Sequence, residues 1–406
     1  MRELLHRDIA HPLLAMLSLQ VVGAIATQAA PVLAPAAADA YGMPVAYIGV
    51  YTSISYAMSM LGGLIGGPLV VRVGSIGVAL LGCGLFFGGL ATFAAGIPAV
   101  GVVSAVMVGL GYGLVNPTSS HILARQSPPR RRAFVFSLKQ TGVPIGGTAT
   151  GILLPLIALN FGWEAAALAA GALAVLLALA IVPMRARFDA DRNSKQRIAI
   201  KGFLAPLLSI LRDRGLRAIS IAGFAYASAQ VCIITYLVAY LTHVIGLSLV
   251  DAGLAFAAFQ AGGFAGRVGW GIIADWLLPT SRLYALLGIL MCIGLSTAAA
   301  VTAAWPLIAI CAVTFLIGTG VLGWNGIYLS EVARMAPGGR ISETTGGAQF
   351  FMFLGPVVVP PLFGLLAETT DYATAYIVIG AATVASSIYL LTLKGGYTGG
   401  TPTGDA

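Results

Sequence analysis

The chain of 406 residues is 58% hydrophobic and only 9% charged, with a formal net charge of +8. Soluble domains carry about 25% charged residues, so this chain has too few polar groups to cover a surface against water. Its solvent must be largely lipid, which excludes a soluble enzyme and a disordered protein.

Long apolar runs separated by polar segments predict twelve membrane-spanning helices. The predicted spans cover residues 13–38, 46–70, 76–96, 98–123, 133–158, 164–183, 216–242, 250–274, 283–303, 306–330, 343–366 and 372–393. We interpret the first run as a retained span and not as a cleaved signal peptide, because it is long for such a peptide.

The distribution of charge predicts the orientation of the spans. With the N-terminus inside, every basic residue except Lys139 and Arg267 falls in a cytoplasmic segment. The outer loops carry acids instead: Asp39, Glu164, Asp251, Glu368 and Asp371. The positive-inside rule therefore predicts a multi-pass protein of the cytoplasmic membrane with both termini in the cytoplasm. The basic excess then requires no nucleic-acid partner.

One long hydrophilic stretch, from Met184 to Arg217, divides the spans into two groups of six. The predicted organisation is an N-terminal six-helix bundle (1–183), a basic cytoplasmic linker (184–215), a C-terminal six-helix bundle (216–394) and a disordered tail (395–406). We interpret the linker as a solvated tether, and contact of its basic face with anionic lipid is the alternative.

The two halves share an internal repeat. An offset of 209 residues pairs Gly109 with Gly318, Gly111 with Gly320, Asn116 with Asn325, Arg125 with Arg334, Arg131 with Arg340 and Gln140 with Gln349. An offset of 204 residues pairs Gly62 with Gly266 and Gly67 with Gly271. The predicted fold is an all-α membrane protein of twelve transmembrane helices in two pseudo-symmetric six-helix bundles, and such repeats are typical of transporters.

The loop between the second and third spans, Gly67-Pro-Leu-Val-Val71-Arg72-Val-Gly74, carries a family resemblance. It resembles the loop signature of the major facilitator superfamily, although Val71 stands where an Asp is usual. The second copy keeps the acid as Asp275. The resemblance covers essentially the whole chain, and it implies two bundles that rock about a substrate site at the membrane midplane.

The same resemblance implies that loop charges pair with helix ends and hold the outward-facing state. The candidate gating residues are Arg72, Arg125, Arg131, Asp275, Arg282, Glu331, Arg334 and Arg340. For each arginine, a solvated position that only fixes topology is the alternative.

Proton-coupled drug export is the alternative function within this superfamily. Such antiporters typically carry an arginine in the fourth span, where this chain has Ala105. Their motif in the fifth span is only half matched by residues 142–147. In the first half no acid falls in the interior of a span, because Glu164 is the first residue of its span. No carboxylate is therefore in place to carry a proton or attract a cationic drug.

Lys139 and Arg267 are the two basic residues well inside predicted spans, since Arg217 is only the second residue of its span. Arg267 precedes Asp275 by eight residues, about 12 Å at 1.5 Å per residue. An arginine at that depth costs at least ~2.5–3.5 kcal/mol, so it should face protein or a water-filled cavity. For Lys139, roughly 9 Å deep by the same rise, a snorkelling interfacial position is the alternative. The repeat places Ala348 and Gly63 at the two corresponding positions, so we predict substrate roles for both cations.

The segment Arg267-Val-Gly-Trp-Gly271 resembles the eighth-span region of monocarboxylate and oxalate–formate carriers, in which an arginine binds the substrate carboxylate. The resemblance implies that Arg267, with Lys139, binds an anionic substrate. The polar and aromatic residues predicted to complete the site are Gln28, Asn116, Tyr226, Gln230, Gln260, Trp324, Asn325, Tyr328 and Gln349. For each of these nine, a helix–helix hydrogen bond or a packing role is the alternative.

The sequence thus predicts a monomeric secondary active transporter of a small organic anion, working by proton symport or by exchange for a counter-anion. His121, Glu331 and the carboxyl group of the substrate are the candidate titrating groups. We predict no enzyme activity, cofactor or metal site, because His121 and Glu331 are isolated and no cysteine pair has ligand spacing. A transporter-like membrane sensor is the remaining alternative.

Overall fold

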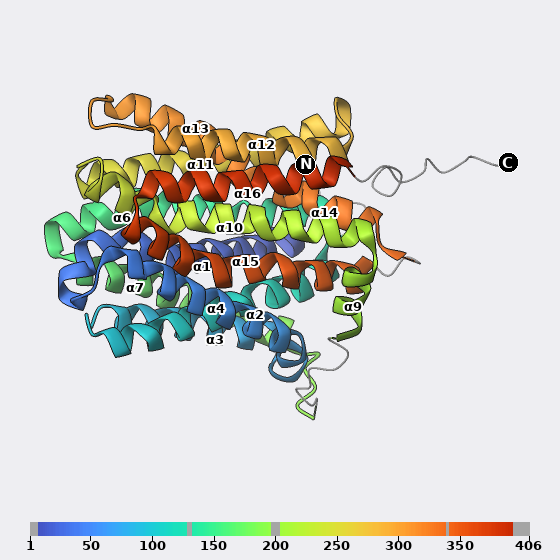
Figure 1. The fold of residues 1–406 in the computed structure, drawn as a ribbon. Coiled ribbons are helices and arrows are strands. Elements are labelled where there is room, and N and C mark those ends of the chain that lie inside the picture. Colours follow the sequence, from blue (N-terminus) through green and yellow to red (C-terminus); the bar gives the residue numbers. More distant parts are fainter. Residues whose placement is uncertain (1–6, 128–131, 196–203, 338–340, 393–406) are drawn as a thin grey trace. The chain divides into compact units, whose positions relative to one another are not determined.

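The structure, a computed structural model, describes residues 7–127, 132–195, 204–337 and 341–392. Arg131, Arg340 and the predicted tail lie outside the described residues. Within these ranges every helix or strand element is helical (Figure 1). The elements are α1 (Arg7–Tyr41), η2 (Val45–Tyr47), α2 (Ile48–Val73), α3 (Ser75–Phe93), α4 (Pro98–Gln126), α5 (Arg132–Gln140), α6 (Gly142–Phe161), α7 (Trp163–Ile181), η4 (Val182–Met184), α8 (Arg185–Phe188), α9 (Leu204–Arg212), α10 (Arg214–His243), α11 (Leu249–Trp276), α12 (Thr280–Ala299), α13 (Leu307–Gly323), α14 (Asn325–Arg334), α15 (Ile341–Thr369) and α16 (Tyr372–Thr392).

Twelve segments of the described chain are long and apolar enough to cross a membrane. They coincide with the twelve predicted spans to within a few residues, so the predicted all-α fold is confirmed. Four spans combine several elements. The second joins η2 to α2. The fifth joins α5 to α6, the sixth continues from α7 through η4 into α8, and the tenth joins α13 to α14.

The helices form two compact units. Unit 1 contains Met1–Ile200 and Ile234–Ala257, and unit 2 contains Lys201–Ile233 and Ala258–Ala406. The boundaries fall inside α10 and α11, so each of these two helices contributes residues to both units.

Each unit is built from helices packed side by side. In unit 1, α4 packs against α2 and α3, α3 against α7, and α1 against α6. The part of α10 that belongs to unit 1 is fixed to η2, because the Tyr236 hydroxyl donates a hydrogen bond to the Ala46 carbonyl at 2.8 Å. In unit 2, α12 packs against α13 and α16, and α15 packs against α9, α14 and α16.

Glycines at one helix crossing show that the internal repeat is also structural. Gly109 on α4 lies against the carbonyl of Ser55 on α2, and a Cβ at this glycine would collide with that oxygen. Gly318 on α13 meets the carbonyl of Phe259 on α11 in the same way. The 209-residue offset relates the two glycines, and the 204-residue offset relates Ser55 to Phe259. Small residues permit such close helix packing in membranes, and both units use the same contact.

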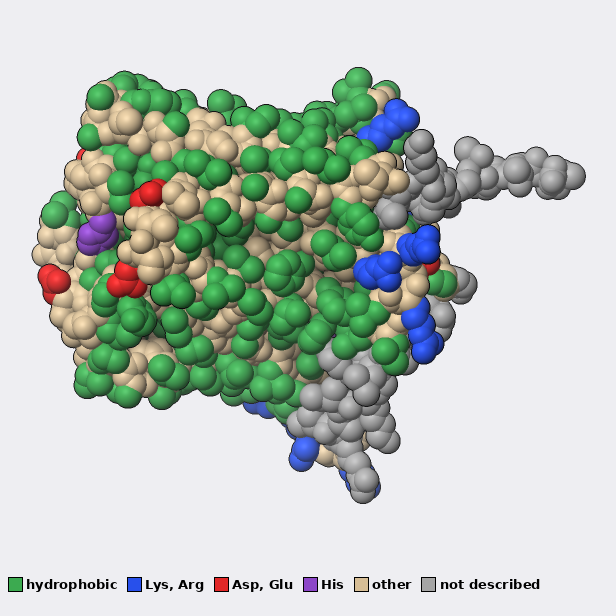
Figure 2. All heavy atoms as spheres, viewed as in Figure 1, with side chains coloured by type: hydrophobic (Ala, Val, Ile, Leu, Met, Phe, Trp, Pro, Cys, Tyr) green, Lys and Arg blue, Asp and Glu red, His purple; other side chains and the backbone are tan. Residues whose placement is uncertain are grey.

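On the face drawn in Figure 2, hydrophobic side chains cover the sides of the helices, and the charged side chains lie near helix ends. Leu176 and Leu179 on α7, for example, are 61% and 66% exposed, as expected for side chains that face lipid. In unit 1, Arg72 lies in the last turn of α2 and Arg125 in the last turn of α4. We call this end of unit 1 its basic end.

Candidate functional site

Lys139 lies in the last turn of α5, just before the fifth span is interrupted. The interruption has a local cause, because Pro144 cannot donate a hydrogen bond to the Gln140 carbonyl. The Lys139 Nζ donates a 2.6 Å hydrogen bond to Asn116 Oδ1 on α4. Lys139 is only 2% exposed, so the structure does not place it as a snorkelling interfacial side chain. Two of the predicted site residues are therefore brought together within unit 1.

Arg267 lies on α11, seven residues before the end of the eighth span at Ala274. Its half-buried guanidinium donates through Nε to the carbonyl of Leu322 at 3.2 Å. One turn later, Trp270 donates through Nε1 to the Thr319 carbonyl at 2.7 Å. Both contacts are made to α13, so the main chain of the tenth span holds this cation inside the membrane-spanning part of unit 2.

The tenth span is interrupted at Trp324, between α13 and α14, and predicted residues gather there. Gln230 on α10 accepts two hydrogen bonds at its Oε1. One comes from Trp324 Nε1 at 2.9 Å and the other from Asn325 Nδ2 at 3.1 Å. The structure thus joins three of the predicted residues in one polar cluster at the helix interruption.

The predicted aromatic residues form a buried cluster within unit 2. Tyr226, Trp324 and Tyr328 are each at most 1% exposed. The Trp324 ring packs edge-on against Tyr226 and Tyr328 at 5.7 and 5.6 Å between centroids. Tyr226 donates to the Tyr284 carbonyl at 3.0 Å, and Tyr328 donates to the Ala348 carbonyl at 2.9 Å. The three rings therefore pack against one another at the helix interruption, and two of them are fixed to main-chain carbonyls.

The remaining predicted glutamines lie on three separate helices. Gln28 on α1 and Gln260 on α11 are buried, and Gln349 on α15 is half-buried. Sequence reasoning missed Gln20 on α1, which is 1% exposed and donates to the Tyr112 hydroxyl at 3.5 Å. The sequence could have indicated Gln20, because it is a polar residue inside an apolar run.

Of the predicted gating residues, Glu331 and Arg334 form an ion pair. Glu331 is fully buried, and it accepts hydrogen bonds from Arg334 Nη2 at 2.6 Å and from Arg334 Nε at 3.2 Å. The Thr280 hydroxyl at the start of α12 donates to its other oxygen. Glu331 therefore connects α14 to α12 and is not a solvated acid at a helix end.

The other predicted gating residues are placed differently. Arg72 and Arg282 are exposed. Arg125 pairs with Asp191, an acid that sequence reasoning did not single out. The side chain of Asp275 lies outside the described residues, together with Arg131 and Arg340.

An apolar cavity of about 330 Å³ lies in unit 1, at the end of the spans opposite the basic end. It is lined by residues of α1, η2, α2, α3 and α4, including Tyr41, Tyr51 and Phe93. None of the predicted substrate-binding residues lines it.

Residues 16–352 match the family model of the Major Facilitator Superfamily. The chain belongs to this superfamily. It is a secondary transporter and not an enzyme, and the family resemblance carried by the second-to-third-span loop is confirmed.

Curated relatives of this superfamily member span nearly its whole length. It is 24% identical over 365 residues to the hexuronate transporter of Bacillus subtilis (strain 168), covering 84% of this chain and 83% of the relative. It is 28% identical over 391 residues to the 4-hydroxybenzoate transporter PcaK of Pseudomonas putida, covering 87% and 86%. It is 27% identical over 370 residues to human monocarboxylate transporter 11, covering 84% and 73%. These relatives are named for organic anions, which agrees with the predicted organic-anion branch.

Solved structures of other superfamily members share the fold. The crystal structure of a D-xylose-proton symporter aligns with a TM-score of 0.75 at 16% identity, covering 97% of this chain and 99% of that one. A bacterial homolog of the human lysosomal transporter Spinster, inward-facing and unoccupied, aligns with a TM-score of 0.72 at 16% identity, covering 95% of both chains.

Proposed function

We propose that this transporter moves a small organic anion, a carboxylate, across the cytoplasmic membrane by alternating access. The observation that carries the proposal is Arg267, a permanently charged side chain held in a membrane span by the Leu322 carbonyl. A guanidinium in this setting is costly, and such residues usually serve substrates or ions. It is also suited to carboxylates, because its planar fork binds both oxygens.

Lys139 is the second cation of the proposal. Its ammonium is buried and held by a neutral amide, Asn116, so the contact positions the charge without neutralising it. We propose that Lys139 and Arg267 both serve the same anion during the transport cycle.

The proposed driving force is a proton gradient or the gradient of a counter-anion, without ATP. The names of the relatives suggest the first substrates to test: a hexuronate and 4-hydroxybenzoate. Proteoliposomes without nucleotide should accumulate one of these labelled acids when given a pH gradient or an internal anion. Accumulation also distinguishes a carrier from a membrane sensor, and a strict requirement for ATP would contradict the proposal.

The decisive experiment compares uptake by Arg267→Gln, Arg267→Lys and Lys139→Gln at matched expression. Losing a charge-assisted hydrogen bond should lower the transport efficiency about ten- to hundredfold for Arg267→Gln. Arg267→Lys keeps the charge and loses the fork, so we expect it to be impaired as well. Arg192→Gln removes an exposed linker arginine and is the matched control. Near-normal uptake by Arg267→Gln would contradict the proposal. Loss of uptake in Lys139→Gln alone would instead place the anion site in the fifth span.

A further inference from the structure

A buried acid, Asp189, fixes the segment that follows the sixth span to unit 1. Asp189 is 4% exposed, and its carboxylate accepts hydrogen bonds from the backbone N–H groups of Ile76 at 2.7 Å and Gly77 at 2.9 Å. These groups belong to the first turn of α3, where backbone donors and the helix dipole favour an anion. Two residues beyond Asp191, the backbone N–H of Asn193 donates to the Val71 carbonyl at 2.7 Å.

The loop between α2 and α3 is shaped to receive this acid. Gly74 has a φ of 96°, which side-chain-bearing residues rarely adopt. A Cβ at this position would also overlap the carboxyl group of Asp189. These hydrogen bonds, together with the conformation of the loop at Gly74, hold the start of the linker against unit 1.

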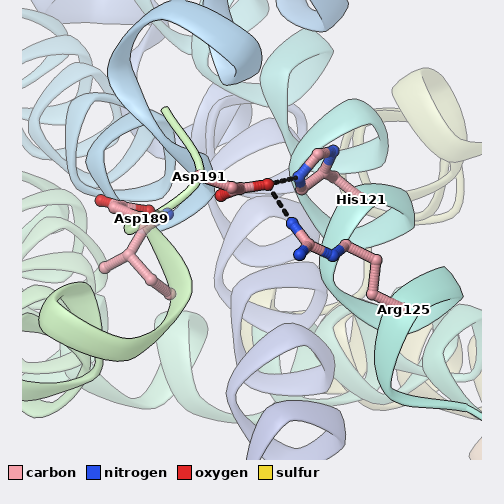
Figure 3. Close-up of polar contacts among 5 residues, drawn as sticks. His121, Arg125, Asp189 and Asp191 are labelled. Carbon is pink, nitrogen blue, oxygen red and sulfur yellow. Dashed lines mark hydrogen bonds and ion pairs between the residues drawn. The ribbon is translucent and has the colours of Figure 1, made fainter. Parts of the chain in front are cut away.

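Asp191, between the two anchor points, points in a different direction. Its carboxylate is directed toward the basic end of α4, where it meets His121 and Arg125 (Figure 3). Its Oδ2 accepts a hydrogen bond from His121 Nε2 at 3.0 Å and another from Arg125 Nη1. Burial raises the pKa of Asp191, but the hydrogen bond from His121 and the charge of Arg125 lower that pKa below its ordinary value. The carboxylate form is therefore favoured at this position.

A polar cavity of about 90 Å³ surrounds this carboxylate. It is lined by His121, Arg125, Gln126, Arg187 and Asp191, together with Ile122, Phe188 and Ala190. A cavity of this size holds several waters, and therefore a phosphate-sized ion. His121 and Arg125 contact the carboxylate, and Arg187 also lines the cavity. The lining thus contains two arginines and one acid, so its formal charge is positive even with Asp191 in place.

We propose that this cavity is a binding site for an oxyanion of the phosphate class, and that Asp191 is its built-in competing ligand. The site would bind either free phosphate or the phosphate of a lipid headgroup, since both present the same oxygens. Arginine forks and an imidazole donor suit a phosphate, which offers more oxygens and more charge than a carboxylate. Asp189 keeps its hold on α3 when Asp191 is displaced, so binding would release one contact of the linker and keep the other.

The test uses the purified full-length transporter in phosphatidylcholine nanodiscs, titrated with inorganic phosphate and followed by the ³¹P line width. Asp191→Asn removes the competing charge, so it should bind phosphate about two- to fivefold more tightly, the range for an exposed ion pair. Adding Arg125→Gln to Asp191→Asn should abolish binding. Adding Arg192→Gln instead should change nothing, because this neighbouring arginine does not line the cavity.

A second arm distinguishes the two sources of the ligand. Nanodiscs that contain phosphatidylglycerol are analysed by native mass spectrometry for lipid that stays bound to Asp191→Asn and is lost with Arg125→Gln. Retention of lipid without phosphate binding would assign the site to a headgroup, and phosphate binding alone would assign it to the free ion. The proposal is overturned when neither ligand binds, or when Arg192→Gln weakens binding as much as Arg125→Gln.

Discussion

At the scale of single residues, the charged side chains inside the spans of this transporter have different partners. The Lys139 ammonium is held by the amide of Asn116, and the Arg267 guanidinium by a main-chain carbonyl. Glu331 instead pairs with Arg334, its own neighbour on α14. The amide of Asn116 is neutral, so the Lys139 ammonium can still attract an added anion. Glu331 is already paired, which suits a structural contact.

Replacing Lys139 should lower transport without lowering stability. Lys139→Met removes a buried ammonium, so the thermal unfolding midpoint should stay constant or rise while uptake falls. Asn116→Leu removes the acceptor of the same ammonium and should cost about 1 kcal/mol of stability. The stability of both variants is measured by thermal unfolding in detergent. A larger loss of stability for Lys139→Met than for Asn116→Leu would show that the lysine acts mainly through packing.

Glu331 and Arg334 should respond unequally to substitution. The side chain of Arg334 is 39% exposed, whereas that of Glu331 is 1% exposed. Arg334→Gln leaves a buried carboxylate without its cation, but Glu331→Gln leaves an arginine that water can reach. We therefore expect Arg334→Gln to lower the unfolding free energy by about 1–3 kcal/mol more than Glu331→Gln. Equal losses would mean that the pair is solvated in solution.

At the scale of elements, close helix crossings depend on glycine. Gly109→Ala and Gly318→Ala each place a methyl group against a main-chain carbonyl, which cannot move aside as a flexible side chain can. Each should cost about 1–3 kcal/mol, the usual range for overpacking. Gly84→Ala on α3 meets no atom within 4 Å and is the control. Thermal unfolding that shows a loss for one crossing and none for the other would contradict the structural repeat.

The start of α16 should be sensitive to pH. The Asp371 carboxylate accepts hydrogen bonds from the Thr374 backbone N–H at 2.7 Å and from its hydroxyl at 2.9 Å, and the backbone hydrogen bond is the main cause of its lowered pKa. Because this pKa is lower in the folded state, the stabilisation is present above the ordinary aspartate pKa and is lost as pH falls through the folded value. Asp371→Ala should therefore lower the unfolding midpoint at pH 6, and the difference should shrink at pH 3. A difference of equal size at both values would exclude the carboxylate as its cause.

At the scale of the whole molecule, charge at the helix ends predicts orientation. A single cysteine at position 192 should be protected from a membrane-impermeant thiol reagent in intact cells, because the linker is predicted to be cytoplasmic. A cysteine at position 370 should react, because the segment before α16 is predicted to face outward. The background is the transporter with Cys83, Cys232, Cys292 and Cys311 replaced. Reaction at position 192 would invert the proposed topology.

The sequence predicted the spans well because lipid imposes a hydrophobic run on every crossing helix. It did not predict the interruptions at Thr141 and Trp324, since hydropathy carries no information about the backbone hydrogen-bond ladder. The sequence could not predict that the hydroxyls of Tyr226 and Tyr328 donate to main-chain carbonyls, because it does not show which helices pack against these rings. The contacts of Asp191 were missed because its partners lie 66 and 70 residues away.

The hold of Asp189 on α3 also limits how far the tether between the two units can reach. Asn193 is still hydrogen-bonded to unit 1, and α9 begins at Leu204. That leaves 204 − 193 = 11 peptide steps, which reach roughly 36–40 Å when fully extended. Deletions within residues 194–203 should therefore slow turnover stepwise while substrate affinity is kept. Insertions of equal size should leave both unchanged, and a fluorescent reporter inserted there should leave transport intact.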